Sequence, residues 1–372
     1  MKKLFIVVNV DYFFLSHRKE VGIVASKKYD VTIVAQDTGR RKDIEDLGLK
    51  FIDLPLDRSG MNLGNEMKTF KFLYTLYKRE KPDLVHHVGL KVILWGTLAA
   101  KLTKINSVVN AISGLGVFFS ADNKSMIGKL LPFVLKFAHS KLNVSCIFQN
   151  DEDRELFILN KIIKENQADF IKGSGVDLNI FTYTEEPDSG KIKVLFTARM
   201  LKEKGVLILA EAAKLIKDRY YDKVEFLLCG ALDDNPTALK QEDIDNICDG
   251  KYIQWLGFRT DVLDLLKNCH IVAFPSYYKE GLPKSLIEAT AIGRPIITTD
   301  SIGCRETVEH EVNGFLIPIK NSEILAQKLS LLIDSKVLRV KMGKESRLLA
   351  EKHFSLNKVI EQHLTIYERL LK

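Results

Sequence analysis

The stretch VLFTARMLKEKGV, residues 194–206, decides how the fold of this 372-residue chain is interpreted. Its first five residues form a short apolar run of the kind that occupies buried strands. A polar turn follows, and a helix pattern begins at Gly205. A strand that passes directly into a helix is typical of α/β domains, in which helices cover both faces of a parallel sheet.

The same alternation continues on both sides of this stretch. The sequence predicts further strands at residues 4–10, 31–35, 84–86, 108–111 and 146–148, and again at 224–228, 253–256, 271–274, 296–298 and 315–317. Helices are predicted between the early strands at 17–26, 66–80, 89–102 and 124–142. The chain therefore contains two successive sets of strands and helices.

A polar segment divides the two sets. FTYTEEPDSGK, residues 181–191, contains Pro187 and Gly190 and has no periodicity, so it is the predicted linker. We expect one domain at residues 1–183, a second at 184–355, and a C-terminal helix at 356–372 that packs back toward the first domain. Both would be doubly wound, Rossmann-like α/β domains facing across a cleft, with ligands bound at the carboxyl ends of the strands.

Composition excludes several classes of protein. With 46% hydrophobic and 28% charged residues, the chain is neither disordered nor fibrous. Its five cysteines are an odd number without a close pair, which favours a reducing compartment over a disulfide scaffold or structural zinc. We interpret the apolar run in MKKLFIVVNVDYFFLSHR as a strand and not a signal peptide. No run approaches the ~20 apolar residues of a spanning helix, so we expect a soluble or peripheral protein.

The net charge of +7 is unevenly distributed. Residues 1–172 contain 27 basic and 19 acidic side chains, a surplus of 8, and the remainder of the chain has a small acidic surplus. Residues 64–142 alone hold 12 basic and 4 acidic residues. A basic surface confined to one half suggests a polyanionic partner: nucleic acid, anionic lipid or a phosphorylated substrate.

The strongest local motif is EGLPKSLIEA, residues 280–289. Pro283 is well placed in the first turn of a helix, so the amides near Lys284 and Ser285 would form an anion site at the helix N-terminus. Glu280 and Glu288 would flank that site, and their carboxylates could accept hydrogen bonds from sugar hydroxyls. The structural alternative is a helix-start charge and a solvated carboxylate.

A second motif lies in the deciding stretch itself. Arg199 would sit at the carboxyl edge of the sheet, and Lys204 directly precedes the helix. Arg can bind a phosphate through two parallel hydrogen bonds and Lys adds a point charge, so together they could stabilise a diphosphate leaving group without a metal. The alternative is two exposed charges in a polar loop.

Taken together, these motifs resemble the signature of family 4 glycosyltransferases with the GT-B fold. The resemblance covers nearly the whole chain and includes HRKEVG after the first strand, ISGLGVFF (112–119), FQNDEDRELF (148–157), GSGVDLNIF (173–181), CGALDDNP (229–236), PSYYKEGLPKSLIEA (275–289) and GCRETVEHEVNGFLIP (303–318). The sequence is similar to bacterial members that add sugars to undecaprenyl-diphosphate-linked glycans for capsule, O-antigen or protein glycosylation.

The resemblance implies retaining transfer of a hexose or N-acetylhexosamine from a nucleotide sugar, with UDP favoured. Glu288 would bind the ribose, Glu280 and the Gly281 and Leu282 amides the sugar, and Arg199 and Lys204 the pyrophosphate. The remaining donor-binding candidates are Gly257, Phe258, Arg259, Pro283, Lys284, Ser285 and Leu286. Such enzymes lack an evident protein nucleophile, so catalysis would consist of positioning and leaving-group electrostatics, with no metal or other cofactor.

One position departs from the family pattern. Many members have a His after a strand of the first domain, where this chain has Ser113 followed by Gly114. His86 and His87 are the nearest substitutes, although a His beside a strand is more often structural. His17 and Arg18, after the first strand, could reach the acceptor diphosphate, or could be capping and ion-pair residues.

An acidic triplet lies at residues 151–153. Asp151–Glu152–Asp153 has the DxD spelling of a metal site, but it opens the helix pattern DEDRELFIL, where acidic residues complement the helix dipole. We therefore predict no metal.

Residues 124–142 combine an apolar body with Lys124, Lys129, Lys136 and Lys141. Such a helix can lie in a bilayer interface or pack within the first domain, with Pro132 kinking or shortening it.

The predicted enzyme is a cytoplasmic glycosyltransferase, peripheral at the inner face of the membrane. Its partners would be a nucleotide-sugar donor, a lipid-diphosphate-linked acceptor and an anionic membrane surface. The alternatives are a GT-B-fold nucleotide-sugar epimerase, a phosphorylase, for which no cofactor site is evident, and a non-enzymatic binder of polyanions or lipid. Nucleic acid is not expected, because the basic region lacks interleaved aromatic residues.

Overall fold

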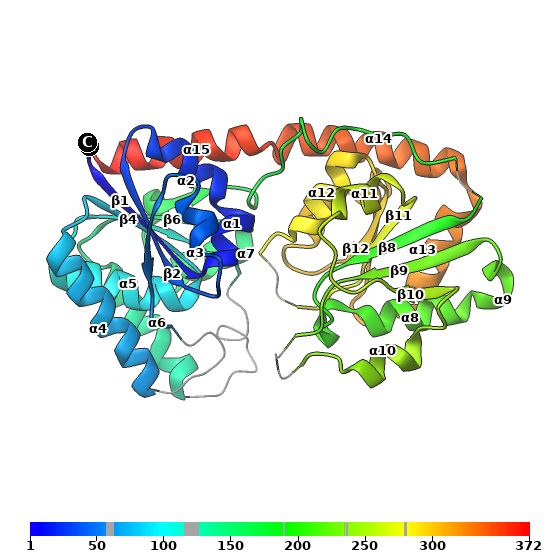
Figure 1. Cartoon of the computed structure of the whole chain (residues 1–372), viewed down its shortest axis with the longest axis horizontal. Helices are drawn as coiled ribbons and strands as arrows, with labels where there is room; N and C mark the ends of the chain where they lie inside the picture. The colour runs from blue at the N-terminus through cyan, green and yellow to red at the C-terminus, as the bar shows by residue number, and fades with distance from the viewer. Residues whose placement is uncertain (57–62, 115–125, 189, 234, 236, 279–280) are drawn as a thin grey trace. The chain divides into compact units, whose positions relative to one another are not determined.

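The computed structural model (Figure 1) describes residues 1–372 except 57–62, 115–125, 189, 234, 236 and 279–280. It forms two compact units. Unit 1 comprises Met1–Ser174 together with Asn357–Lys372, and unit 2 comprises Gly175–Leu356. The chain thus passes into unit 2 earlier than the predicted boundary at residue 183, and its last helix belongs to unit 1.

Unit 1 is built on a parallel sheet of seven strands in the order β3-β2-β1-β4-β5-β6-β7. The strands are β1 (Lys3–Val10), β2 (Asp30–Gln36), β3 (Lys50–Asp53), β4 (Leu84–Val88), β5 (Ser107–Ala111), β6 (Asn143–Phe148) and β7 (Ala168–Phe170). In the centre, Ile6 of β1 pairs with Ile33 of β2 and with His86 of β4. All the strands predicted for this half are present. The short β3 and β7 were not predicted, because four and three residues are too few to show a period.

Helices cover both faces of this sheet. One face packs against helices α4 (Leu63–Glu80), α5 (Leu90–Thr103), α6 (Met126–His139) and α7 (Asp151–Leu159). The other packs against α1 (Asp11–His17), α2 (Lys19–Ser26), α3 (Arg41–Glu45) and the C-terminal α15 (Leu356–Leu370). Val359, Ile366 and Tyr367 of α15 are buried in that second core, because its apolar residues recur at helical spacing. The C-terminal helix therefore packs on unit 1, as expected, and it does so through apolar side chains.

Unit 2 is built on a parallel sheet of six strands in the order β10-β9-β8-β11-β12-β13. The strands are β8 (Ile192–Thr197), β9 (Val224–Cys229), β10 (Ile253–Trp255), β11 (Ile271–Phe274), β12 (Ile296–Thr299) and β13 (Gly314–Ile317). The helices are α8 (Val206–Leu215), α9 (Lys217–Tyr220), α10 (Gln241–Ile247), α11 (Val262–Lys267), α12 (Lys284–Ile292), α13 (Ser322–Asp334) and α14 (Lys336–His353). All six predicted strands are present.

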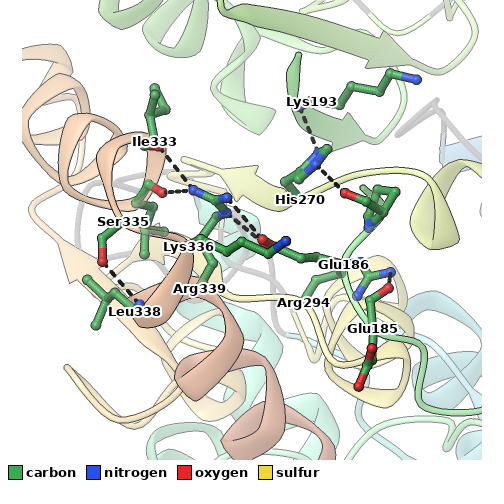
Figure 2. Close-up of polar contacts among 12 residues, drawn as sticks. Glu185, Glu186, Lys193, His270, Arg294, Ile333, Ser335, Lys336, Leu338 and Arg339 are labelled. Carbon is green, nitrogen blue, oxygen red and sulfur yellow. Dashed lines mark hydrogen bonds and ion pairs between the residues drawn. The ribbon is translucent and has the colours of Figure 1, made fainter. Parts of the chain in front are cut away.

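The predicted linker is firmly anchored to unit 2, as Figure 2 shows. Arg339 forms two hydrogen bonds to the carboxylate of Glu186, of 2.7 and 3.0 Å, and both side chains are almost fully buried. Arg294, also buried, donates to the carbonyl oxygens of Thr184 and Glu185. His270 contacts the carbonyl oxygen of Pro187 at 3.0 Å. These contacts hold carbonyl groups and the Glu186 carboxylate of this segment against unit 2, while Glu185 and Asp188 stay exposed.

All five cysteines are free. Within the described residues, no helix combines the length and the apolar character needed to cross a bilayer.

Candidate functional site

The loops that follow the strands of unit 2 gather at one edge of its sheet, because all its strands are parallel. Strand order reverses beside β8: β9 lies on one side of it and β11, which comes later in the chain, on the other. Ligands of open α/β sheets bind where the order reverses, since the loops there leave in opposite directions. The carboxyl ends of β8 and β11 therefore define the candidate site.

The loop after β8 is pressed against the loop after β11. Gly205 begins α8 with φ 83°, and a Cβ built on it would lie 2.0 Å from the carbonyl oxygen of Pro275. The carbonyl oxygen of Glu203 accepts hydrogen bonds from the amide of Tyr277 at 2.9 Å and from Ser276 Oγ at 3.1 Å. The two loops are thus fixed to each other by backbone contacts that require a glycine.

Lys204 lies at this junction. Its Nζ is 5.7 Å from the ring centre of Phe274, the last residue of β11, and 5.4 Å from that of Tyr278. Attraction between an ammonium group and aromatic ring faces holds the side chain beside the loop that leads to α12. A point cation at this position can neutralise a phosphate group.

Arg199 lies on the other side of β8. Its Nη1 is 2.7 Å from Oδ2 of Asp233, in the loop after β9, and 43% of its side chain is exposed. Exposed ion pairs contribute little to stability. Arg199 can therefore exchange Asp233 for an anionic ligand at small cost. Arg199 and Lys204 both lie at the carboxyl edge of the sheet, as the sequence predicts. Arg199 contacts Asp233, whereas Lys204 contacts the rings of Phe274 and Tyr278.

Helix α12 begins at the same edge. Its N-cap is Pro283, in an extended conformation with no side-chain cap hydrogen bond, so the proline lies just before the helix and not in its first turn. The first amides of a helix have no intrahelical acceptor and form the positive end of its dipole. Gly281 and Leu282 lead into the helix, and the buried Leu282 and Leu286 fix its start in the core. Ser285 is half-buried in the first turn.

Glu288 lies one turn further along α12. Its carboxylate is 3.6 Å from Nζ of Lys284, and 14% of its side chain is exposed. Burial raises the pKa of Glu288, against the opposing attraction of Lys284. The attraction of Lys284 only partly offsets the cost of burying the Glu288 charge, so this carboxylate is a good acceptor for hydrogen bonds from hydroxyl groups. Glu280, predicted to bind the sugar, lies outside the described residues.

The loop after β10 contributes an exposed aromatic ring. Gly257, with φ 66°, accepts a hydrogen bond from the Gly230 amide at 2.8 Å, which ties this loop to the end of β9. Phe258 follows and is 73% exposed. Arg259 pairs with Asp261 through two hydrogen bonds, of 2.7 and 2.5 Å. An exposed ring at a sheet edge that carries cations can stack on a planar base.

Glu288→Gln should raise KM for the donor about 10-fold and leave kcat nearly unchanged. The substitution removes one charge-assisted hydrogen bond, and a contact to a non-reacting ribose is used alike in ground and transition states. Initial rates over a range of donor concentrations give both constants. Glu211→Gln, which removes an exposed carboxylate from α8, is the matched control. A large fall in kcat with unchanged KM in the Glu288 variant would contradict the ribose-binding role.

The described residues at the corresponding edge of unit 1 include Ser113, Gly114 and Asn9. Ser113 and Gly114 follow β5 and are half-buried, so the predicted position lies at the carboxyl edge of the sheet. At the reversal between β1 and β4, a Cβ built on Gly89 would lie 3.1 Å from Asn9 Nδ2. Oδ1 of Asn9 is buried and has no partner in the described part of the chain. Asn9 was not predicted from the sequence.

His87 is a core residue, which corrects its assignment as a cleft candidate. It is 0% exposed within β4. Its Nδ1 faces Asn110 Oδ1 at 2.8 Å, and its Nε2 faces the Tyr77 hydroxyl at 2.9 Å. Asn110 Nδ2 in turn lies 2.8 Å from Nε2 of His139. This network joins α4, β4, β5 and α6, and every hydrogen bond in it is consistent with neutral imidazoles.

His86 and Arg18 are enclosed on the opposite face of the sheet. His86 Nδ1 lies 2.6 Å from the Tyr367 hydroxyl, and its ring centre is 5.5 Å from that of His363, so α15 covers it. Arg18 is 3% exposed, and burial lowers its pKa to about 10. The expectations that His86 replaces the family's cleft His and that Arg18 reaches the acceptor are therefore not met in this structure, because the C-terminal helix packs over His86 and Arg18 is buried.

His17 differs from its neighbour in being partly exposed. Its ring stacks on Phe13 with centroids 4.4 Å apart, and its Nδ1 is 2.6 Å from Ser16 Oγ. Both contacts lie within α1, so they orient the ring without enclosing it. The acceptor role of His17 stays a prediction.

Unit 1 should lose stability as the pH falls from 6.5 toward 4. Burial lowers the pKa values of His87 and His139 to about 4 and that of His363 to about 3, whereas an unfolded His titrates near 6.5. Because the unfolded chain binds more protons in this window, each group removes up to about 1.4 kcal/mol of stability per pH unit.

Hydrogen exchange at pH 7 and pH 5, corrected for intrinsic rates, checks this expectation. Peptides from β4 and β5 should lose protection at pH 5 more than peptides from β8 and β11. Equal protection of unit 1 at both values would contradict the prediction.

The acidic triplet opens a helix, as predicted. Asp151, Glu152 and Asp153 form the first turn of α7, where Asn150 Oδ1 caps the Asp153 amide at 2.8 Å. Among the described residues there is no cluster of three or more His, Cys, Asp or Glu side chains suited to a metal ion.

Sequence reasoning missed two partners in the unit 2 site. Asp233 holds Arg199, and the Glu203 backbone joins the two central loops. Asp233 lies in a polar turn with no periodicity, so only its place after the neighbouring strand could have suggested it. The role of Glu203 is carried by its carbonyl group, which no side-chain pattern reveals. At the same edge, Thr197 Oγ1 and Glu203 Oε2 are buried and have no partner within the described residues.

Comparison with known families is consistent with this geometry. A family model described as "Glycosyl transferases group 1" matches residues 183–349, and one described as "Glycosyl transferase 4-like" matches residues 3–151. The first match contains the whole unit 2 site.

Two curated relatives match along nearly the whole chain. The N,N'-diacetylbacillosaminyl-diphospho-undecaprenol alpha-1,3-N-acetylgalactosaminyltransferase of Campylobacter jejuni is 32% identical over 358 residues, covering 91% of each chain. The UDP-Gal:alpha-D-GlcNAc-diphosphoundecaprenol alpha-1,3-galactosyltransferase of Escherichia coli is 27% identical over 360 residues, covering 94% of this chain and 91% of the relative.

Solved structures show the same architecture. Anabaena Alr3699/HepE in complex with UDP has a TM-score of 0.78 and 18% identity, over 99% of this chain and all of its own. A glycosyltransferase from Rickettsia africae has a TM-score of 0.75 and 20% identity, over 100% and 99%.

Proposed function

Because the chain belongs to the group 1 glycosyltransferases and has their GT-B fold, we propose that it transfers a sugar from UDP to an undecaprenyl-diphosphate-linked glycan. The observation that carries this proposal is the meeting of Lys204, Arg199 and the N-terminus of α12 at the strand-order reversal of unit 2. Positive groups from the loop after β8 and from the start of α12 suit a diphosphate, the part common to all nucleotide-sugar donors.

UDP is the proposed nucleotide. One relative is named for UDP-Gal, and the Anabaena neighbour was solved with UDP. Phe258, exposed beside Gly257, offers a stacking surface for the base, and the partly buried Glu288 offers an acceptor for the ribose hydroxyls. The diphosphate would lie between these two residues and the sugar.

The proposed acceptor follows from the names of the relatives. Both name a sugar linked through diphosphate to undecaprenol. The sugar transferred would be a hexose or N-acetylhexosamine, as in those two proteins. A lipid-linked acceptor sets the reaction at a membrane surface, and we assign it to the cytoplasmic face because nucleotide sugars are cytoplasmic metabolites.

Retention of configuration is the proposed stereochemistry. Both relatives are named for alpha-1,3 products, and a UDP-linked galactose or N-acetylgalactosamine has the α configuration. The described residues at the site offer cations and a helix N-terminus, which fit a mechanism of positioning plus stabilisation of the departing diphosphate. The acceptor hydroxyl would attack from the face that UDP leaves.

We propose that the reaction needs no divalent metal, because Lys204, Arg199 and α12 supply the positive charge that a metal would otherwise provide. Turnover should be nearly unchanged in EDTA. Complete loss with chelator, restored by Mg²⁺ or Mn²⁺, would overturn this part of the proposal.

Labelled UDP-sugars, incubated with and without an undecaprenyl-diphosphate-linked glycan, test the proposed function. Label should move into the lipid fraction only when the acceptor is present. Conversion of the donor into another nucleotide sugar would indicate the epimerase alternative. Binding to anionic vesicles without any conversion of the donor would indicate a non-enzymatic protein.

A further inference from the structure

Arg18 has far fewer partners than the other buried arginines in the described part of the chain. Arg294 donates to carbonyl oxygens from Nε and from both Nη atoms. Arg339 contacts the Glu186 carboxylate and two carbonyl oxygens. Arg18, which joins α1 to α2, donates from Nη1 to the carbonyl oxygen of His17 at 2.9 Å, and its Nε is buried without a partner among the described residues.

The positive charge of Arg18 also lacks an opposite charge. In the described ranges no carboxylate pairs with it, and the one group whose charge would raise its pKa is the Tyr367 hydroxyl. Burial lowers the pKa of Arg18 to about 10, so the guanidinium is still protonated at pH 7. A buried charge without a counter-charge is costly. An anion beside Arg18 would remove most of that cost.

Two imidazole nitrogens belong to the same cluster. His86 on β4 and His363 on α15 are fully buried, and their ring centres are 5.5 Å apart. Nε2 of each ring has no partner within the part of the chain that the structure describes. The charge of Arg18 lowers the pKa of both rings, so all three groups lie within electrostatic reach of one another. They come from three different elements of unit 1.

The contact at Nδ1 decides which form of each neutral ring is present. His363 Nδ1 lies 2.7 Å from the carbonyl oxygen of Val359, which can only accept, so the proton is on Nδ1 and Nε2 has a lone pair. His86 Nδ1 lies 2.6 Å from the Tyr367 hydroxyl, a group that burial keeps protonated by raising its pKa. That hydroxyl donates to Nδ1 and leaves the proton of His86 on Nε2. At neutral pH, Arg18 Nε and His86 Nε2 are therefore both donors.

We infer that Arg18 Nε and His86 Nε2 bind a buried monatomic anion, chloride, between the α1–α2 junction, β4 and α15. Two N–H donors and a cation without a counter-charge are what a halide needs. The burial of Arg18, His86 and His363 favours an ion without substituents over phosphate or a carboxylate. A water molecule could accept from the same donors, but it would leave the charge uncompensated. This site is independent of sugar transfer, and the ion would fix α15 to the sheet.

Chloride binding should become tighter as the pH falls. The titratable groups that face the His363 ring are Arg18, His86 and Tyr367, and burial and Arg18 lower the pKa of His363 to about 3. A bound anion offsets the charge of Arg18 and accepts from a protonated Nε2, so it should raise the pKa of His363. Because the bound state then takes up protons more readily than the free state, the chloride Kd at pH 5 should be lower than at pH 8.

Crystals of the full chain prepared with bromide in place of chloride test the site directly. Bromide has the same charge, and its anomalous scattering identifies its position. We expect an anomalous peak within contact distance of Arg18 Nε and His86 Nε2. A water molecule at that place, or a carboxylate paired with Arg18, would overturn the inference.

Hydrogen exchange in solution distinguishes a structural ion from an adventitious one. In a chloride titration at constant ionic strength, with gluconate as the replacement, amides of α15 and β4 should exchange more slowly as chloride increases. The slowing should reach about 10-fold at ten times the Kd, because bound chloride lowers the population of the open form by mass action. Peptides from β8 and β11 should not respond. Equal exchange of α15 in chloride and gluconate would overturn the inference.

Variants of Arg18 separate its charge from its packing. Arg18→Gln should abolish the chloride dependence, because a buried amide needs no counter-charge, whereas Arg18→Lys should keep part of it. The matched control is Arg79→Gln, which removes the same charge from an exposed position on α4 and should respond to chloride as the wild type does. Chloride dependence that persists in a folded Arg18→Gln variant, or that is lost equally in the control, would overturn the inference.

Discussion

Replacing Arg199 and Lys204 by Ala should each lower kcat by about 100-fold or more, by analogy with the loss of one preorganised oxyanion donor. Negative charge develops on the departing diphosphate in the transition state, so cations that contact it stabilise that state more than the bound donor. Lys204 is held for this purpose by the rings of Phe274 and Tyr278, and Arg199 needs only to leave the half-buried Asp233.

The chain offers a matched control for both substitutions. Lys217 Nζ lies 5.3 and 5.7 Å from the ring centres of Tyr221 and Tyr252, a setting like that of Lys204, and Arg219 forms an exposed pair with Asp334. Alanine at positions 217 and 219 should leave kcat unchanged. Wild-type rates in folded Arg199 or Lys204 variants would refute the leaving-group role and require the site to be placed elsewhere.

Gly205→Ala should abolish most of the activity and destabilise unit 2 by several kcal/mol. The new Cβ would lie 2.0 Å from the carbonyl oxygen of Pro275, at a φ of 83° that L side chains rarely adopt. Relief of this contact must separate the loop carrying Lys204 from the loop that leads to α12. Backbone strain and overpacking each cost on the order of 1–3 kcal/mol.

Gly250→Ala separates strain from steric conflict. Gly250 has a similar φ of 75°, but a Cβ there would meet no atom within 4 Å. This variant should lose only about 1 kcal/mol, the cost of the left-handed conformation, and keep its activity. Urea unfolding and steady-state rates measure both effects. Similar activity and stability in the two variants would show that contact with Pro275 does not maintain the site.

Much of the fold could be predicted because its strands are short, apolar and fully buried. Runs such as those of β1, β8 and β11 stand out between helix patterns, and strand–helix alternation leaves few topologies other than parallel sheets. Strand β3 and helix α1 escaped because one is only four residues long and the other starts without a break after β1. The linker was misjudged because Glu186 is buried by Arg339, a partner 153 residues away.

The positions of the site residues could be predicted from the sequence better than their contacts. Arg199 and Lys204 follow a strand, and parallel topology alone assigns them to the carboxyl edge. Their neighbours Asp233 and Tyr278 come from other loops. The loop of Tyr278 is placed by the close fit of Gly205 against Pro275, and the loop of Asp233 by the close fit of Gly230 against Ala198. In unit 1, the burial of His86 and Arg18 could not be foreseen, because it depends on α15, which lies more than 250 residues later.

Titration of the protein with UDP, followed by calorimetry, tests whether the carboxyl edge of unit 2 between β8 and β11 binds a nucleoside diphosphate. The wild type and the Lys217→Ala/Arg219→Ala control should bind UDP alike. The Arg199→Ala/Lys204→Ala variant should bind at least about 10-fold more weakly, since each charge-assisted contact to phosphate contributes about 1.5–3 kcal/mol. Equal UDP affinity in the three folded proteins would show that this edge of unit 2 does not bind the diphosphate.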